Sequence, residues 1–212
     1  PETIGSIAYL SQNFKEMKDK IIAGYNVTCV GDDRAYSFIP SRNGKTISDM
    51  VAIHTLKHID KKFEKYTWFD RGSDERQYCA PGVDLPIASI TRSKYGEYPE
   101  YHTSLDDLKF ISQEGLEGSV EVYLKAISII NDNYIPKPLI ICEPNMGKRG
   151  LYSKISKKES TDSVTNLTMD IISICDGKNS ILDISEIIGR PFWEVKKTIE
   201  DLIKEKIIES SK

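Results

Sequence analysis

Hydrophobic and polar residues alternate along the first part of the chain in blocks that predict an α/β fold. Residues 5–18 place apolar side chains on one face at helical spacing, which predicts a helix. Residues 21–30 are typical of a buried strand that ends at the turn signal Gly31. Residues 46–63 predict a second helix, with Ser48 as its N-cap. The chain therefore opens with helix, strand and helix.

The same kind of pattern continues as far as residue 131. Residues 66–69 and 87–90 predict strands on either side of a loop at 71–82, and residues 116–131 predict a long helix. The expected inner face of that helix consists of apolar residues at helical spacing: Val120, Leu124, Ile127 and Ile130. Strands that alternate with helices are typical of an α/β sheet whose functional loops lie at strand ends.

The composition changes at Pro136, which predicts a division into domains. Residues 1–135 form the first expected domain. Residues 136–163 are rich in Pro, Gly, Lys and Ser and are expected to connect it to a second domain at residues 164–212.

The second domain has the pattern of a winged helix. Helices are predicted at residues 165–175, 182–188 and 191–206, with Gly at the intervening turns, and a short strand at 207–209. Two short helices, a tight turn, a longer helix and a strand make a winged-helix-like shape.

The overall composition limits the classes of function. The chain has 212 residues, of which 39% are hydrophobic, and a net charge of -3. This allows a real core but gives no general attraction to nucleic acid or anionic membranes. No apolar run approaches the roughly 18 residues needed to cross a bilayer. Because residue 1 is Pro, the natural N-terminus is expected to lie upstream.

The four cysteines lie far apart and form no CxxC pair with metal-ligand or redox spacing. They are Cys29, Cys79, Cys142 and Cys175. We expect buried thiols in a reducing cytoplasm, with Cys79 as a packing residue rather than a nucleophile.

Glu2 is the first candidate for chemistry. It precedes a helix start at Gly5 and Ser6, where backbone N–H groups favour a carboxylate. In a partly buried site, such a carboxylate can act as a general base for a water. The alternative is an ordinary acid stabilised by the helix dipole, and the local pattern leaves both open.

A second set of candidates surrounds the loop at residues 71–82. His102 lies in a polar loop where a neutral imidazole can bind a metal, although a hydrogen-bonded surface histidine fits as well. Asp74, Glu75 and Arg76 can supply a ligand, an anchor for a substrate amine and a clamp for a substrate carboxylate, respectively. They can equally form a structural ion-pair network.

Two further patterns favour ordinary structural roles. His54 and His58 share one helix face but have no Glu between them to act as a zinc-protease base, so we expect them to face solvent. Residues 145–150 contain Gly and Lys without the full spacing of a phosphate-binding loop, which predicts a basic turn.

Four motifs occur in order: PETIGSIAYL at residues 1–10, GSDERQYCAPG at 72–82, PEYHTS at 99–104 and GKRGLY at 147–152. Together they resemble a bacterial family of aminopeptidase-like proteins, distant relatives of the zinc-dependent exopeptidases that include bacterial leucyl aminopeptidase and glutaminyl cyclase. Members often carry a C-terminal winged-helix-like tail, and many occur in surface-polysaccharide biosynthesis contexts. The resemblance implies part of a three-layer sheet domain of the zinc-exopeptidase type, followed by a small winged-helix-like domain.

The resemblance also implies roles for individual residues. Glu2 matches the first Glu of the family's Glu-Glu pair, the general base, while Thr3 stands where the second, a metal ligand, would be. Thr28 occupies the place of another metal carboxylate. His102 matches the final metal histidine, followed as in the family by an acid at Asp106.

Because two carboxylate ligands are replaced, the resemblance favours one zinc ion, with Glu2 or Glu75 filling a coordination place. The remaining ligands would come from a motif upstream of residue 1. The chain is therefore expected to be the C-terminal part of a longer protein and not competent by itself.

The predicted function is zinc-dependent hydrolysis of an amide bond at the N-terminal side of a small peptide or amino-acid conjugate, with Arg76 and Tyr101 as substrate contacts. The alternative is a catalytically degenerate binding module, linked through the family to polysaccharide biosynthesis. No membrane or nucleic-acid partner is expected, because residues 160–212 hold more acids than bases. The oligomeric state stays open, a homo-oligomer included.

Overall fold

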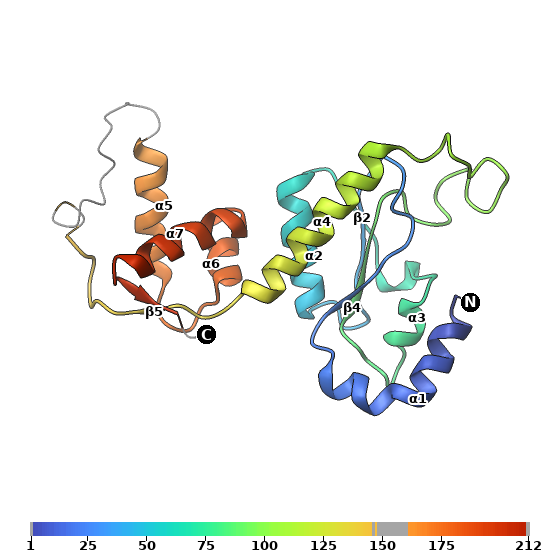
Figure 1. The fold of residues 1–212 in the computed structure, drawn as a ribbon, viewed down its shortest axis with the longest axis horizontal. Coiled ribbons are helices and arrows are strands. Elements are labelled where there is room, and N and C mark those ends of the chain that lie inside the picture. Colours follow the sequence, from blue (N-terminus) through green and yellow to red (C-terminus); the bar gives the residue numbers. More distant parts are fainter. Residues whose placement is uncertain (1, 146, 148–160, 211–212) are drawn as a thin grey trace. The chain divides into compact units, whose positions relative to one another are not determined.

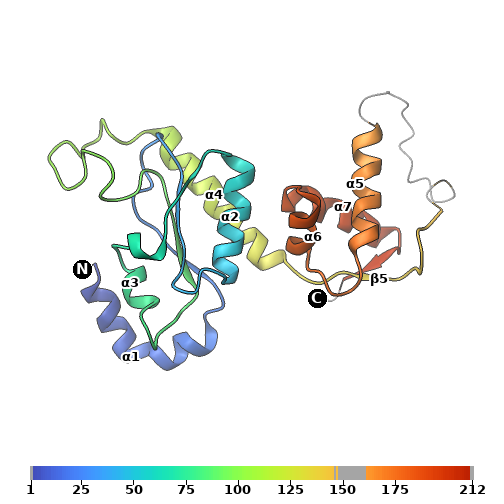
Figure 2. The ribbon, with the colours of Figure 1, turned by 180° about the vertical axis from the view of Figure 1, so that it is seen from behind.

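The computed structural model describes residues 2–145, 147 and 161–210. The chain forms two compact units, Pro1–Ile130 and Asn131–Lys212. Figures 1 and 2 show the elements of each unit from opposite sides. Half of the predicted connecting segment at 136–163 and most of the predicted basic turn at 145–150 lie outside the described residues.

The N-terminal unit is built on a four-stranded mixed sheet. Its strands are β1 (Gly24–Asn26), β2 (Ser37–Ile39), β3 (Glu64–Lys65) and β4 (Ile87–Thr91). The strand order is β1-β4-β2-β3. Strand β4 pairs in parallel with β1 and antiparallel with β2, and all five of its residues are buried. Strand β4 is therefore the centre of the sheet.

Helices cover both faces of this sheet (Figure 1). They are α1 (Ile4–Lys20), α2 (Ile47–Ile59), α3 (Glu75–Tyr78) and α4 (Gln113–Asp132), with a 3₁₀ turn η1 at Trp68–Asp70. On one face, Leu56 of α2 and Val122 of α4 pack with Ile90 of β4. On the other, Leu10 of α1 packs with Ile87 of β4. The unit thus has the three layers that the resemblance predicted.

The predicted helices and the predicted strand at 87–90 are confirmed, but the other strands of this unit differ from the prediction. Only Gly24–Asn26 of the expected strand at 21–30 is extended and paired. The expected strand at 66–69 is mostly the 3₁₀ turn η1, and the adjoining strand is Glu64–Lys65. Strand Ser37–Ile39 was not predicted. Strands of two or three residues are too short for alternation to identify.

The predicted N-cap of α2 was wrong by two residues. Thr46 is the cap and forms a reciprocal capping box with Asp49. Ser48 is buried instead, where its hydroxyl donates to the carbonyl oxygen of Pro86 and accepts from the N–H of Gly24. Ser48 therefore joins α2 to the sheet.

The inner face of α4 is also different from the predicted one. The residues buried along this helix are Gly115, Ser119, Val122, Ala126 and Ile129. A Cβ atom at Gly115 would overlap the carbonyl oxygen of Gly31, so this position needs glycine. The apolar residues predicted to face inward, such as Leu124, lie largely exposed.

The C-terminal unit has the predicted winged-helix form. Its elements are α5 (Thr161–Ile174), α6 (Ile181–Ile188), α7 (Phe192–Lys204) and the antiparallel strands β5 (Lys137–Pro138) and β6 (Ile208–Glu209). Ser180 and Asp183 form the capping box that starts α6, and Gly189, with φ 67°, ends it. Helix α7 then buries Phe192 and Ile199 in the core of the unit.

Along the described parts of the chain, no helix combines the length and apolar character required to span a bilayer.

Candidate functional site

Thr3 ties the start of α1 to the loop before α3, two segments 71 residues apart in sequence. The backbone N–H of Thr3 donates to Oδ1 of Asp74 at 2.6 Å. The Ser6 hydroxyl lies 3.0 Å from the same oxygen and 2.7 Å from the carbonyl oxygen of Thr3. Thr3 has φ 57°, a conformation unfavourable for a β-branched residue. The Asp74 carboxylate therefore holds the turn that carries Glu2.

Glu75 is the most enclosed acid of the N-terminal unit, with no exposed surface. Its carboxylate accepts four hydrogen bonds: from the N–H of Gly72 (2.8 Å), the N–H of Ser73 (3.0 Å), the Tyr95 hydroxyl (2.7 Å) and the Asn26 amide (3.0 Å). Burial, and then Glu75 itself, raise the pKa of Tyr95, so its phenol stays protonated and donates. Glu75 thus joins β1, the loop at 72–73 and the loop after β4.

The three consecutive residues predicted as substrate contacts, Asp74, Glu75 and Arg76, differ in their exposure. Glu75 is buried and both its oxygens have donors, which gives it a supporting role in place of the predicted substrate contact. Asp74 is half-buried and uses one oxygen on Thr3 and Ser6. Arg76 is exposed in the first turn of α3. Of the three, Arg76 has the surface most open to a substrate.

His102 is exposed and belongs to the loop that follows β4. Its ring stacks on Tyr101, with the centroids 3.9 Å apart and the planes 16° apart. The residue has φ 57°, again in the left-handed region. Nearby, Glu100 accepts two hydrogen bonds from the Arg34 guanidinium, at 2.6 and 3.0 Å. Stacking and this ion pair together orient an accessible imidazole.

Glu2 and Tyr101 interact electrostatically although 99 positions separate them in the sequence. Partial burial is the main cause that raises the pKa of Tyr101, and electrostatic interactions with Cys29 and Glu2 raise it further. Glu2 itself is exposed. Tyr101 therefore stacks on the predicted metal histidine and interacts electrostatically with the predicted base.

Two further residues of this region were not predicted as site residues from the sequence. Cys29, at φ 48°, has its Sγ 3.6 Å from the Tyr98 hydroxyl. Asp32 is buried and accepts from the hydroxyl and the N–H of Ser93, at 2.7 and 2.9 Å. Their position directly after β1 was the available signal, because functional groups of α/β sheets gather beyond strand ends.

The ligands that the described residues offer to a metal are incomplete. His102 and Glu2 are accessible, and the Cys29 thiol is partly so. Within residues 2–130, however, no three ligand atoms of His, Cys, Asp or Glu lie within 4.8 Å of one another. The residues present fit one part of a metal site, and further ligands would have to complete it.

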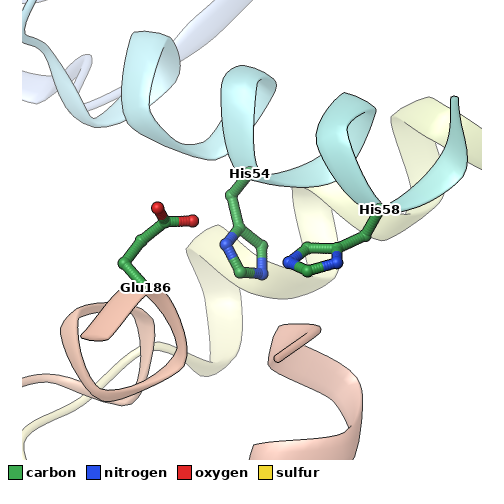
Figure 3. A group of neighbouring side chains, drawn as sticks. All are labelled: His54, His58 and Glu186. Atoms are coloured by element: carbon green, nitrogen blue, oxygen red, sulfur yellow. The ribbon is translucent and has the colours of Figure 1, made fainter. Parts of the chain in front are cut away.

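His54 and His58 lie one turn apart on α2, with ring centroids 4.7 Å apart (Figure 3). His54 is fully buried and His58 partly so, which corrects the prediction that both face solvent. Glu186, the third side chain in Figure 3, belongs to α6 of the C-terminal unit.

The cysteines are free thiols, as predicted, but they are not all buried. Cys79 and Cys175 are buried, Cys29 is partly buried, and Cys142 is exposed, contrary to expectation. Burial raises the pKa of Cys79, and its Sγ lies 3.2 and 3.1 Å from the carbonyl oxygens of Leu85 and Ile87. These contacts fit the predicted packing role of Cys79.

A mixed sheet between two helical layers, with polar groups beyond its strand ends and a winged helix in the same chain, defines a two-domain α/β protein. Residues 1–133 match the family described as "Domain of unknown function (DUF4910)", and residues 135–210 match the winged helix-turn-helix family. The chain belongs to the DUF4910 family.

Similar proteins support this class. A Clostridium acetobutylicum protein named "Putative polysaccharide biosynthesis protein with aminopeptidase-like domain" is 36% identical over an alignment of 213 positions, which covers 98% of this chain and 48% of that protein. The chain thus spans about half the length of this relative. A crystal structure from the same organism, described as a "putative peptidase", is 33% identical with a TM-score of 0.87 over 99% of this chain and 46% of its own.

A more distant neighbour shows the fold alone. The aminopeptidase from Aneurinibacillus sp. strain AM-1 has a TM-score of 0.50 and 19% identity, over 60% of this chain and 30% of its own.

Proposed function

We propose that the N-terminal unit is part of the catalytic domain of a zinc-dependent aminopeptidase-like hydrolase, with Glu2 as general base and His102 as a metal ligand. The observation that carries this proposal is that Tyr101, on which His102 stacks, also interacts electrostatically with the Glu2 carboxylate. A carboxylate near a metal-bound carbonyl is the arrangement that amide hydrolysis needs.

The geometry around Glu2 suits a general base. Asp74 and Ser6 hydrogen-bond to the backbone of Thr3. The backbone beside Glu2 is therefore held in place, while the Glu2 side chain stays accessible. Fixed placement of a base lowers the entropic cost of reaching the transition state. Glu2 would take a proton from the attacking water and return it to the leaving amine.

Zinc, when bound, would polarise the scissile carbonyl and lower the pKa of a bound water. We propose His102 as the ligand from this chain and place the missing ligands in a further part of a longer protein, of which this chain would be the C-terminal portion. The replacement of two carboxylate positions by Thr3 and Thr28 favours a single ion.

The proposed substrate is a peptide or amino-acid conjugate with an amide at its N-terminal side. Arg76 is exposed and can pair with a substrate carboxylate, and the edge of Tyr101 can contact a side chain. The name of the Clostridium relative links that protein to polysaccharide biosynthesis. This favours an amino acid linked to a sugar over an unmodified peptide as the substrate.

A second candidate function is binding without hydrolysis. Thr3 and Thr28 stand where the resemblance expects carboxylate ligands, and a site that has lost them can retain substrate recognition. The zinc content of the protein distinguishes the two functions.

We expect the complete protein to bind about one zinc ion per chain, because the resemblance implies a single tetrahedral site. His102→Ala should lose this zinc while the fold persists, since His102 is exposed. Asp107→Ala, an exposed acid nearby, serves as the control and should keep the metal. Elemental analysis by plasma mass spectrometry gives the stoichiometry. Wild-type protein without stoichiometric zinc would favour the binding module.

We propose a protein-contact or structural role for the winged helix rather than DNA binding. The basic residues of α7 are largely neutralised: Lys196 pairs with Asp132 and Lys204 with Asp201, both at distances of 2.8 Å or less. Paired cations release few counterions from DNA.

Residues 131–212 are therefore expected to show no salt-dependent affinity for duplex DNA. Fluorescence anisotropy with a labelled random duplex, measured in the complete protein at low and physiological salt, tests this. Binding that weakens steeply with added salt would assign the winged helix to DNA.

A further inference from the structure

His102 belongs to a long connection with little core of its own. Residues 92–112, all of which the structure describes, join β4 to α4 without a helix or a strand. Residues 102–109 are exposed throughout. Connections of this length without secondary structure are uncommon in compact domains and are usually functional. The position of the His102 imidazole therefore depends on the side chains that tie this connection to the rest of the unit.

The backbone of Arg34, between β1 and β2, is tied to the start of this connection. The buried carboxylate of Asp32 accepts a hydrogen bond from the Arg34 N–H at 3.1 Å. The same carboxylate accepts from the hydroxyl and the N–H of Ser93, at 2.7 and 2.9 Å. The guanidinium Nε of Arg92 donates to the Asp32 carbonyl oxygen at 2.6 Å. Arg34 is thus held against the residues that directly follow β4.

From this base the Arg34 guanidinium reaches two points of the connection. It donates hydrogen bonds to both carboxylate oxygens of Glu100, at 3.0 and 2.6 Å, and Glu100 lies two residues before His102. Its Cζ lies 4.6 Å from the centroid of the Phe110 ring. Because the guanidinium is a planar fork, this bidentate and stacked arrangement fixes direction as well as distance. Arg34 therefore holds the connection on both sides of His102.

Packed rings continue this contact as far as the imidazole. Phe110 stacks on Tyr98, with centroids 4.9 Å apart and planes 21° apart. Tyr98 meets Tyr101 in an edge geometry, at 5.5 Å and 76°. Tyr101 in turn stacks on His102 at 3.9 Å. Aromatic pairs in these geometries are favourable beyond the area that they bury. The rings form one column that begins under Arg34 and ends on His102.

We propose that Arg34 is a positioning residue for the His102 imidazole, holding its turn through Glu100 and its column of rings through Phe110. The expected consequence is a preorganised metal ligand and a tighter zinc site, and this consequence rests on the proposed function. Groups that orient metal-binding side chains typically contribute about 10–100-fold to metal affinity. Arg34 acts through His102 and contacts neither metal nor substrate.

Nuclear magnetic resonance of the His102 ring tests the positioning without zinc or substrate. In the metal-free complete protein with labelled histidine, the stacked Tyr101 ring shields the imidazole Cε1–H, so its signal lies upfield. His102→Gln identifies this signal as the one that disappears. We expect Arg34→Ala to move it downfield as the stacking is lost. Arg34→Lys keeps the charge but lacks the planar fork, so its shift should be smaller.

Arg42→Ala is the matched control. Arg42 pairs with Asp84 at the surface of the same unit, and its side chain is 42% exposed, compared with 47% for Arg34. This variant should leave the His102 signal in place. The midpoint of denaturant unfolding should be the same in the wild type and in the Arg34 and Arg42 variants, because exposed ion pairs contribute little to global stability.

Zinc affinity measures the consequence of the positioning. Competition with a chromophoric chelator is expected to give a zinc dissociation constant about tenfold or more higher in Arg34→Ala than in the wild type. The zinc stoichiometry at saturation should be unchanged, because Arg34 is not a ligand. Arg34→Lys should give an intermediate dissociation constant, and Arg42→Ala that of the wild type.

An unmoved His102 signal in Arg34→Ala would overturn the proposal. Equal shifts in Arg34→Ala and Arg42→Ala, or a lower unfolding midpoint in Arg34→Ala alone, would also overturn it by making the role of Arg34 merely structural. A moved signal with wild-type zinc affinity would overturn the link to the metal. A wild type without zinc whose signal moves only in the Arg34 variants would contradict the proposed function and leave the positioning of the imidazole supported.

Discussion

Replacing Glu75 by alanine is expected to lower the free energy of unfolding of the N-terminal unit by about 3 kcal/mol or more. The substitution removes the acceptor for four donors at once: the N–H groups of Gly72 and Ser73, the Tyr95 hydroxyl and the Asn26 amide. Each buried donor left without a partner costs about 1–3 kcal/mol. Hydrogen exchange of the β4 amides, followed as a function of denaturant concentration, measures the free energy of unfolding of this unit separately from that of the winged helix.

Two variants sharpen the result. Glu75→Gln keeps the shape of the side chain and one carbonyl acceptor, although its N–H₂ group would face other donors. Its decrease in the free energy of unfolding should therefore be smaller than that of Glu75→Ala. Glu64→Ala, at an exposed position in β3, should change stability by less than about 0.5 kcal/mol. A Glu75→Ala effect no larger than that of Glu64→Ala would contradict the supporting role of Glu75.

The hydrophobic pattern predicted helices well because their period repeats over several turns. Helices α1, α2, α4 and α7 each extend over 13 residues or more. Strands β2 and β3 have three and two residues, too few for a period of two to stand out. The order of strands in the sheet depends on pairing between segments that are distant in sequence. A local hydrophobic pattern carries no information about that pairing.

Helix α4 shows a different limit of the pattern. Spacing alone gave Leu124 and its neighbours as the inner face, whereas Val122 and Ala126 pack on the sheet. Both faces are apolar at helical spacing, and the sequence does not say which of them meets the sheet.

The candidate site was accessible from the sequence only in part. Resemblance pointed to Glu2 and His102, and in the structure Tyr101 stacks on His102 and interacts electrostatically with Glu2. The sequence could not show that Glu75 is buried, because its partners Asn26 and Tyr95 lie 49 and 20 residues away. Tertiary packing determines whether Glu75 is buried. The sequence alone therefore could not decide between a substrate contact and a structural role for Glu75.

Glu2→Gln is expected to lower kcat for amide hydrolysis by about 10²–10⁴-fold, the usual contribution of a positioned general base. The amide cannot take the proton of the attacking water, but it preserves the size of the side chain. Because Glu2 is exposed and Thr3 makes the contact with Asp74, the variant should fold as the wild type does. KM should change little, since the base acts in the transition state.

Glu16→Gln is the matched control for this variant. Glu16 is an exposed acid on the same helix, α1, and pairs with Lys20 at the surface. Its hydrolysis rate should equal that of the wild type.

The most direct test of the central claim is the steady-state hydrolysis of amino-acid amides and conjugates by the complete, zinc-loaded protein, with zinc content measured in the same samples. The account predicts hydrolysis by the wild type and by Glu16→Gln, and loss of kcat in Glu2→Gln at unchanged zinc. Unchanged turnover in Glu2→Gln, or a zinc-loaded wild type that hydrolyses none of these amides, would contradict it.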